Sequence, residues 1–240
     1  MLNFQKKEME ELIKILEKFD IERDKKIKGV WDANAVAKCF EDCAKEILCN
    51  GYFLVNNKYI IDLGAIELYY HEETGSIKDY AMYHIPERYQ HPNTKVFQLE
   101  KDENNEFPYF KFGSFNLHQF GVDVTFENPE KKYRASFLIR SYRVLKVEDV
   151  ANGYPSYVTT DFDHHMSHIF DDMFYEGFST PITWVKYPKG VTIEQDSRKN
   201  LKHKDLKIDE KGNYIIEKSE DDDTRQWQFK LKGLDVNNSK

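Results

Sequence analysis

Two amphipathic helices are predicted within the first fifty residues. Residues 4–19 carry apolar side chains three or four positions apart between charged ones, at Met9, Leu12, Ile13, Leu16 and Phe19. This spacing is typical of a helix that buries one face. The charged segment 21–29, IERDKKIKG, predicts a linker. A second helix is expected from a cap at Asp32 or Asn34 to about Cys49.

After this helix the hydrophobic period becomes that of a strand. Residues 52–70 hold two runs of β-branched and aromatic side chains around Asn56-Asn57, which predicts a β-hairpin. Two further strands are expected at Phe112–Phe126 and Tyr133–Val144, with a turn between them. A final strand is predicted in TRQWQFKLKG, residues 224–233.

The remaining segments are expected to be less regular. Residues 72–106 are polar and interrupted by glycine and proline, which predicts mainly loop. Residues 161–174 are expected to be helical, and residues 179–188 a short strand or an extended loop. Residues 199–223 are highly charged and predict an excursion into solvent.

The order of these elements predicts the fold class. The strands are joined largely by turns rather than by helices, which favours an α+β fold. We expect a single domain with a curved, mainly antiparallel sheet and flanking helices. Residues 1–29 would form an amino-terminal helix and linker, and residues 30–240 the main domain.

Composition narrows the class of protein. Aromatic residues make up 15% of the chain, whereas disordered chains are poor in them. No apolar run approaches the ~18 residues that span a bilayer, and residues 1–19 contain no signal-peptide core. Cys39, Cys43 and Cys49 lie close together, as reduced thiols would rather than a disulfide framework. We therefore expect a cytoplasmic protein with no membrane partner.

The net charge of −7 argues against non-specific affinity for nucleic acid, because that affinity rests on a basic surface. It leaves room for a local basic patch.

Three side chains suggest an internal polar site. Glu67 closes the apolar run IIDLGAIE, and the strand period places Tyr69 on the same face. Arg140 interrupts the apolar strand FLIRSY, and a buried arginine needs a carboxylate partner, such as Glu67 or Asp123. The alternative is a solvent-exposed Glu67 paired with a surface cation, with the aromatic side chains serving only as core packing.

A histidine cluster invites a metal interpretation. His164 and His168 are one helical turn apart, with Asp161 and Asp172 nearby. Zinc needs three or four well-placed ligands, and the HExxH pattern is missing from this segment. We expect these histidines to face solvent, and we expect no metal and no cofactor.

Two segments carry a resemblance to a known family. Residues 60–84, IIDLGAIELYYHEETGSIKDYAMYH, place Glu67 and Tyr69 at a strand end, before an acidic loop that ends at His84. Residues 113–145 form a glycine-bearing aromatic strand, a turn, and a hydrophobic strand that contains Arg140. This arrangement resembles the alkyladenine (3-methyladenine) DNA glycosylase family, and a weaker likeness follows at residues 197–201 and 226–229. The resemblance covers residues 30–240 and leaves the first helix outside.

The resemblance implies a base-excision repair enzyme that acts on DNA damage. Glu67 would activate a water to hydrolyse the N-glycosidic bond of an alkylated or damaged purine, and Arg140 would support the carboxylate. Tyr69, His84 and Phe120 would contact the extruded base. The implied partner is damaged DNA, and we expect all five side chains to converge on one pocket.

Departures from the family pattern keep a second function open. The family has an aromatic wedge where this chain has Asp123, and an asparagine beneath the base where Glu127 is the nearest match. An acidic residue at the DNA-intercalating position should weaken duplex binding, favour single-stranded or mismatched sites, and make Asp123→Tyr strengthen duplex binding. The alternative is a non-catalytic relative that binds a ring-containing ligand, nucleic acid or a protein partner.

Overall fold

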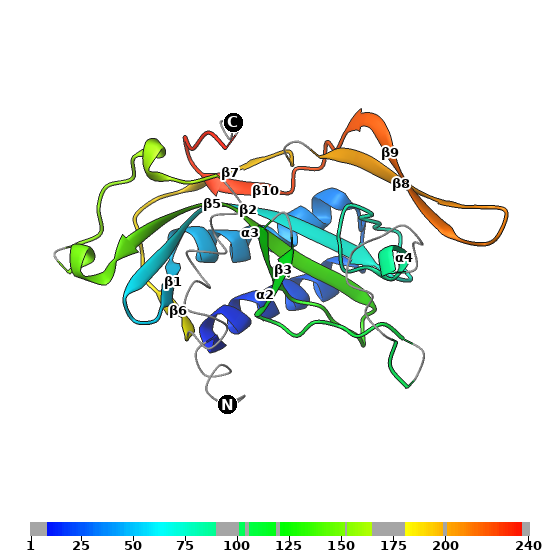
Figure 1. The fold of residues 1–240 in the computed structure, drawn as a ribbon, viewed down its shortest axis with the longest axis horizontal. Helices are drawn as coiled ribbons and strands as arrows, with labels where there is room; N and C mark the ends of the chain where they lie inside the picture. The colour runs from blue at the N-terminus through cyan, green and yellow to red at the C-terminus, as the bar shows by residue number, and fades with distance from the viewer. Residues whose placement is uncertain are drawn as a thin grey trace.

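A curled antiparallel sheet forms half of a barrel around two helices (Figure 1). The computed structural model describes residues 9–89, 101–103, 106–118, 121–151, 153–164, 181–198 and 201–236. The main sheet has the strand order β3-β4-β5-β2-β1-β6, and β10 joins β2 to β7. Its strands are β1 Gly51–Val55, β2 Tyr59–Glu72, β3 Ser114–His118, β4 Gly121–Thr125, β5 Tyr133–Lys146, β6 Ile182–Lys186, β7 Ile193–Asp196 and β10 Gln228–Leu231. The described residues thus form an α+β single domain.

Helices α2 (Glu10–Lys26) and α3 (Ala33–Cys49) fill the concave side of this sheet. Phe40 of α3 lies against Phe137 of β5, Phe229 of β10 and Phe126, which directly follows β4, with ring centroids 5.6–6.3 Å apart. The predicted cap of α3 is Asp32, whose carboxylate accepts a hydrogen bond from the Ala35 amide at 2.9 Å. One face of the sheet therefore packs against the helices in the core, and the opposite face can carry a binding site.

The first helix extends further toward the carboxyl end than the sequence pattern predicts, and residues 4–8 of the predicted helix lie outside the described residues. The predicted linker 21–29 is wrong over most of its length, because α2 continues to Lys26. The buried Arg23 explains the extension: its Nε donates to the Tyr70 hydroxyl at 2.7 Å, and its Nη2 lies 3.0 Å from Glu72 Oε1. These contacts hold the last turns of α2 against β2.

The long strand β2 pairs with β5 on both sides of a bulge, and across this bulge its neighbour on the other edge changes from β1 to β10. The predicted hairpin is confirmed, with Asn56 and Asn57 at φ 53° and 56° between β1 and β2. Beyond it the ladder with β5 shifts twice, leaving Gly64 and Arg140 without a direct partner. A Cβ on Gly64 would lie 2.5 Å from Phe162, so this close approach requires glycine.

Other predicted elements differ in detail. The strand predicted at Phe112–Phe126 is instead the two strands β3 and β4, paired from Ser114↔Thr125 to His118↔Gly121. Of the two alternatives expected for residues 179–188, a short strand or an extended loop, the structure shows a strand, β6. A 3-10 turn, η2 (Thr159–Asp161), ends where the helix 161–174 was expected to begin, and Asp163 bridges Tyr142. The rest of that predicted helix lies outside the described residues.

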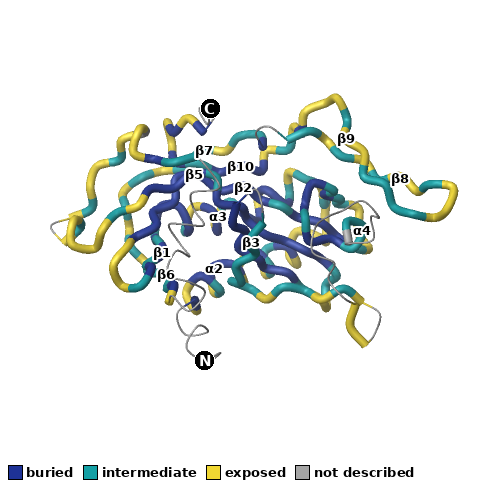
Figure 2. The backbone as a smooth tube through the Cα atoms, in the orientation of Figure 1, coloured by how far each residue is buried: buried dark blue, intermediate teal, exposed yellow. Residues whose placement is uncertain are grey.

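The charged segment near the carboxyl end forms a separate two-stranded hairpin. Strands β8 (Lys202–Ile208) and β9 (Tyr214–Asp222) pair only with each other in the described structure. They project from the body of the molecule, and their surface is largely exposed, whereas β2 and β5 are largely buried (Figure 2). Short helices occur at α4 (Pro86–Tyr89) and η1 (Val147–Val150). No helix in the described ranges is both long and apolar enough to cross a membrane.

Candidate functional site

A row of paired side chains crosses four neighbouring strands on the face of the sheet opposite the helices. The ladder pairs Asp123 of β4 with Leu138 of β5, Leu138 with Glu67 of β2, and Glu67 with Gln228 of β10. Residues paired across antiparallel strands point to the same face. Segments distant in sequence therefore bring two carboxylates and an amide to one surface.

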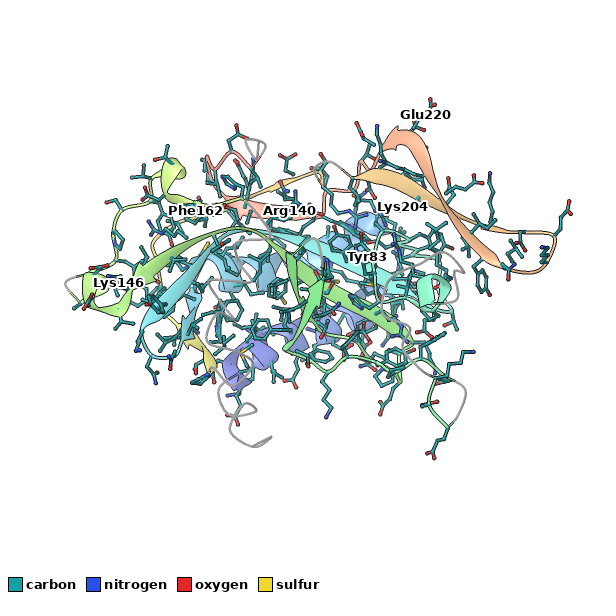
Figure 3. All side chains as sticks on the ribbon, in the orientation of Figure 1. Tyr83, Arg140, Lys146, Phe162, Lys204 and Glu220 are labelled. Atoms are coloured by element: carbon teal, nitrogen blue, oxygen red, sulfur yellow. The ribbon has the colours of Figure 1, made fainter. Side chains whose placement is uncertain are left out.

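This row forms part of a pocket of about 460 Å³. Strand residues supply one wall, the loop after β2 and the end of β3 supply a second, and the β8–β9 region supplies the rim. Among the side chains labelled in Figure 3, Arg140 belongs to the strand wall, Tyr83 to the loop and Lys204 to the rim. The lining residues are Glu67, Tyr69, Ala81, Met82, Tyr83, His118, Asp123, Leu138, Arg140, Leu201, Lys202, Lys204 and Lys218.

Glu67 is almost completely buried, with 1% of its surface exposed, and three side chains contact its carboxylate. The Tyr69 hydroxyl donates to Oε1 at 2.6 Å, and Gln228 Nε2 donates to Oε2 at 3.4 Å. Arg140, which is partly buried, has its Nε 3.7 Å from Oε2, so Glu67 is the carboxylate partner expected for this arginine. Burial, together with the nearby Glu67 charge, holds the pKa of Tyr69 well above its usual range, so the phenol remains a donor.

A buried ion-pair network supports Tyr69 from behind. The Arg198 guanidinium lies 4.8 Å from the centre of the Tyr69 ring and bonds to Asp79 at 2.6 and 3.1 Å. Arg225 also contacts Asp79 at 3.1 Å, and both arginines bond to Asp223. Burial alone would raise the pKa of Asp79, but the charges of the two arginines outweigh it and hold that pKa well below its usual range.

His84 lies behind the pocket wall rather than in it. Its Nδ1 bonds to Glu127 Oε1, and its Nε2 lies 3.2 Å from Ser136 Oγ and 3.8 Å from Asp123 Oδ2. His84 does not belong to the described residues that line the pocket. The structure therefore places it to hold Asp123 and Glu127, one layer away from the base-contacting position that the resemblance implies.

Asp123 points into the pocket and does not project as a wedge. Only 4% of its surface is exposed, and its Oδ2 lies 3.3 Å from His118 Nε2. Its Oδ1 accepts no hydrogen bond from any described residue. The structure thus places this side chain in the pocket lining, and its assignment to the DNA-intercalating position stays a prediction.

The pocket has an aromatic wall that the sequence did not reveal. Tyr83 and His118 stack with ring centroids 5.0 Å apart and planes 25° apart, and both line the pocket. Phe120, the aromatic residue implied by the resemblance, lies outside the described residues. The available signal was strand alternation, because His118 is two positions from Phe120 and shares its predicted face.

Two opposed lysines at the rim were also missed. Lys204 of β8 and Lys218 of β9 are direct cross-strand partners, and both line the pocket. Burial, followed by the charges of Arg88 and other cations, lowers the pKa of Lys204 to about 8. The sequence of this segment predicts a solvated charged stretch, so only its pairing register shows that the two lysines are cross-strand partners beside the pocket.

Within the described ranges, no group of three or more His, Cys, Asp or Glu side chains is arranged to hold a metal ion. His168 and Asp172 lie outside those ranges, so the interpretation of the histidine cluster stays a prediction. The three cysteines are free thiols buried in α3.

Comparisons with protein-family models, curated proteins and solved structures found no match to this chain.

Proposed function

We propose that this protein is a DNA glycosylase that hydrolyses the N-glycosidic bond of a damaged purine nucleotide. The observation that carries the proposal is the buried Glu67 carboxylate, held by Tyr69 and Arg140 in the wall of a partly open pocket. Its volume of about 460 Å³ lies in the range of small-molecule sites, ~300–1,000 Å³.

The proposed reaction uses one carboxylate and one water. Glu67 takes a proton from the water, the water oxygen bonds to C1′ of the sugar, and the electron pair of the broken C1′–N bond leaves with the base. A base that is already cationic departs as a neutral molecule. The negative charge of Glu67 also stabilises the oxocarbenium-like transition state, as it does in other glycosidic hydrolyses.

The pocket walls would hold the extruded base. Tyr83 and His118 offer a flat aromatic surface, and base–aromatic stacking contributes ~1–3 kcal/mol per base. The lysines at the rim supply positive charge for the nucleotide phosphates, which the net charge of −7 does not.

The resemblance to the alkyladenine DNA glycosylase family supports the same assignment at three positions. Glu67, Tyr69 and Arg140 match the family's general base, base-contacting tyrosine and supporting arginine, and all three line this pocket. We extend the proposal to the fold of that family. His84 and Asp123 depart from the pattern in position, so base recognition would differ in detail.

A second candidate function is binding without hydrolysis. The observation that favours it is that both Glu67 oxygens already accept hydrogen bonds, from Tyr69 and Gln228. A carboxylate held in this way can serve as a hydrogen-bond acceptor in the wall of a ligand pocket.

The test is single-turnover base release from oligonucleotides that carry hypoxanthine, ethenoadenine or 3-methyladenine. Released base leaves an abasic site, which alkali converts to a strand break. We expect release by the wild type and a loss of at least ~100-fold in Glu67→Gln with binding retained. Glu220→Gln, an exposed carboxylate on β9, is the control. Binding without release would favour the second candidate, and unchanged release by Glu67→Gln would reject Glu67 as the base.

A further inference from the structure

The β8–β9 hairpin contains a like-charge pair that its own stability does not explain. Lys204 and Lys218 face each other directly across the ladder, an arrangement that destabilises a sheet. Other lysines of the hairpin have carboxylate partners: Lys202 lies 2.8 Å from Asp222, and Lys207 lies 2.5 Å from Glu217.

Lys204 and Lys218 form no ion pair with any residue in the described part of the chain. Both instead line the pocket that contains Glu67. The position of the pair at the pocket rim therefore calls for a functional explanation.

We propose that Lys204 is an amine nucleophile, and that it condenses with the aldehyde of an abasic sugar in the Glu67 pocket. The identity of this aldehyde rests on the proposed function, because hydrolysis of the glycosidic bond leaves a C1′ hemiacetal that opens to an aldehyde. The protein would then also cleave the DNA strand at the abasic site. Neither activity requires the other in a test that starts from a preformed abasic site.

The surroundings of Lys204 increase the fraction of its amine that is neutral and nucleophilic. Burial and the charges of Arg88, Arg198 and Lys218 lower the pKa of Lys204 to about 8, against the opposing charge of Asp79. Compared with a lysine of pKa near 10.4, the neutral fraction at pH 7 rises on the order of a hundredfold. A desolvated lysine beside a second cation is a recognised way to activate an amine for Schiff-base formation. The other titratable or charged groups that line the pocket are Glu67, Tyr69, Tyr83, His118, Asp123, Arg140 and Lys202.

The reaction balances without an oxidant or reductant. The lone pair of Lys204 Nζ adds to C1′, and the carbinolamine loses water to give an iminium ion. A pocket carboxylate removes a proton from C2′, and the electrons of that C–H bond form a double bond as the C3′–O bond breaks. The 3′ phosphate leaves with the electron pair of the C3′–O bond, and water hydrolyses the iminium ion to restore the amine.

The experiment traps the iminium ion. Full-length protein is incubated with a single-stranded oligonucleotide that carries a preformed abasic site, in the presence of cyanoborohydride, and the covalent adduct is mapped by peptide mass spectrometry. We expect the adduct on Lys204 and a loss of more than ~10-fold in Lys204→Arg, which keeps the charge but lacks the nucleophile. Lys207→Arg, on the same strand but outside the pocket lining, is the matched control and should trap as the wild type does.

The pH dependence and a second variant add independent readouts. The trapping rate should rise with pH and level off above about 8, where the Lys204 amine is neutral. Lys218→Ala removes a neighbouring positive charge, so the pKa of Lys204 should rise and trapping at pH 7 should slow. No adduct with the wild type, an adduct on another lysine, or full trapping by a folded Lys204→Arg would overturn the proposal. Trapping without base release by the wild type would instead reject the glycosylase and keep the amine nucleophile.

Discussion

Glu67 remains inside the protein because its neighbours offer it hydrogens and positive charge. An isolated buried carboxylate would be costly, but Tyr69 donates at 2.6 Å and the Arg140 guanidinium lies 3.7 Å away. Arg140 sits at the bulge of β5, where the extra residue re-aims the strand. The same contacts that allow Glu67 to be buried also fix its direction toward the pocket.

The buried position of Asp123 reverses the mutational prediction made from the sequence. A stacking side chain at this position was expected to strengthen duplex binding. Because Asp123 is 4% exposed and points into the pocket, we now expect Asp123→Tyr to fill the site, cost ~1–3 kcal/mol through overpacking and weaken ligand binding.

Fluorescence anisotropy with a damaged oligonucleotide measures the effect of Asp123→Tyr on binding, and thermal melting measures its effect on stability. Asp123→Asn, which keeps the volume, is the control for the lost charge. Tighter duplex binding by Asp123→Tyr would restore the wedge interpretation.

At the scale of one element, the β8–β9 hairpin is attached to the body through the buried network at its base. Asp79 contributes stability to the folded state through a depressed pKa. This contribution is complete above the ordinary aspartate pKa near 4 and is lost as the pH falls below it. The network therefore couples the hairpin, and the pocket rim that it carries, to the strand that holds Glu67.

We expect Asp79→Ala to lower the free energy of unfolding by ~3–5 kcal/mol at pH 7, because it leaves the buried Arg198 with one carboxylate fewer. The variant should also lose less stability than the wild type between pH 5 and pH 3, since it lacks one of the groups whose protonation destabilises the native state. Urea unfolding at the two pH values measures both effects. Asp221→Ala, an exposed carboxylate on β9, serves as the control. An equal acid sensitivity in Asp79→Ala and the wild type would show that Asp79 does not contribute to it.

The elements differ in how far the sequence could predict them. The cap at Asp32 and the Asn56-Asn57 turn are local signals, and both are confirmed. The end of α2 depends on contacts of Arg23 with Tyr70 and Glu72, which lie 47 and 49 residues away. Contacts between residues so far apart leave no local sequence pattern. The charged carboxyl end of α2 was therefore predicted to be a linker.

The site shows the same division between local and long-range information. Glu67 and Tyr69 are two residues apart, and strand alternation alone places them together. The pairing of Arg140 with Glu67 followed from the requirement of a buried arginine for a carboxylate. The lysine pair depends on the register of a hairpin within a uniformly charged segment, where no buried face fixes the register in advance.

At the scale of the whole molecule, the first helix belongs to the same core as the sheet. Phe19 is fully buried and contacts the rings of Phe40, Tyr70, Phe126 and Tyr133 at 5.3–6.2 Å. We expect Phe19→Ala to destabilise the protein by ~3–5 kcal/mol, in one cooperative transition that far-UV and near-UV circular dichroism report together. Ile21→Ala, at a 55% exposed position of the same helix, should change stability little. Separate transitions for the helix and the sheet would contradict a shared core.

The distribution of charge over the molecule predicts how it would bind nucleic acid. The chain carries a net charge of −7, so attraction to phosphates must come from the pocket rim, where Lys204 and Lys218 form no ion pair with any described residue. At pH 7, where a Lys204 amine of pKa about 8 is still mostly protonated, two phosphate contacts on a single strand predict that log K falls with log salt at a slope of about −1.4. A duplex brings more phosphates toward an acidic surface without further basic contacts, so single-stranded or disrupted sites should bind more tightly.

Titrations of one damaged oligonucleotide, single-stranded and in matched duplex, between 50 and 300 mM salt test both the slope and the preference for single strands. Lys218→Ala should make this slope less steep by about 0.7, whereas Lys207→Arg should leave it unchanged. A slope of about −5 or steeper would place the phosphates on another surface of the protein.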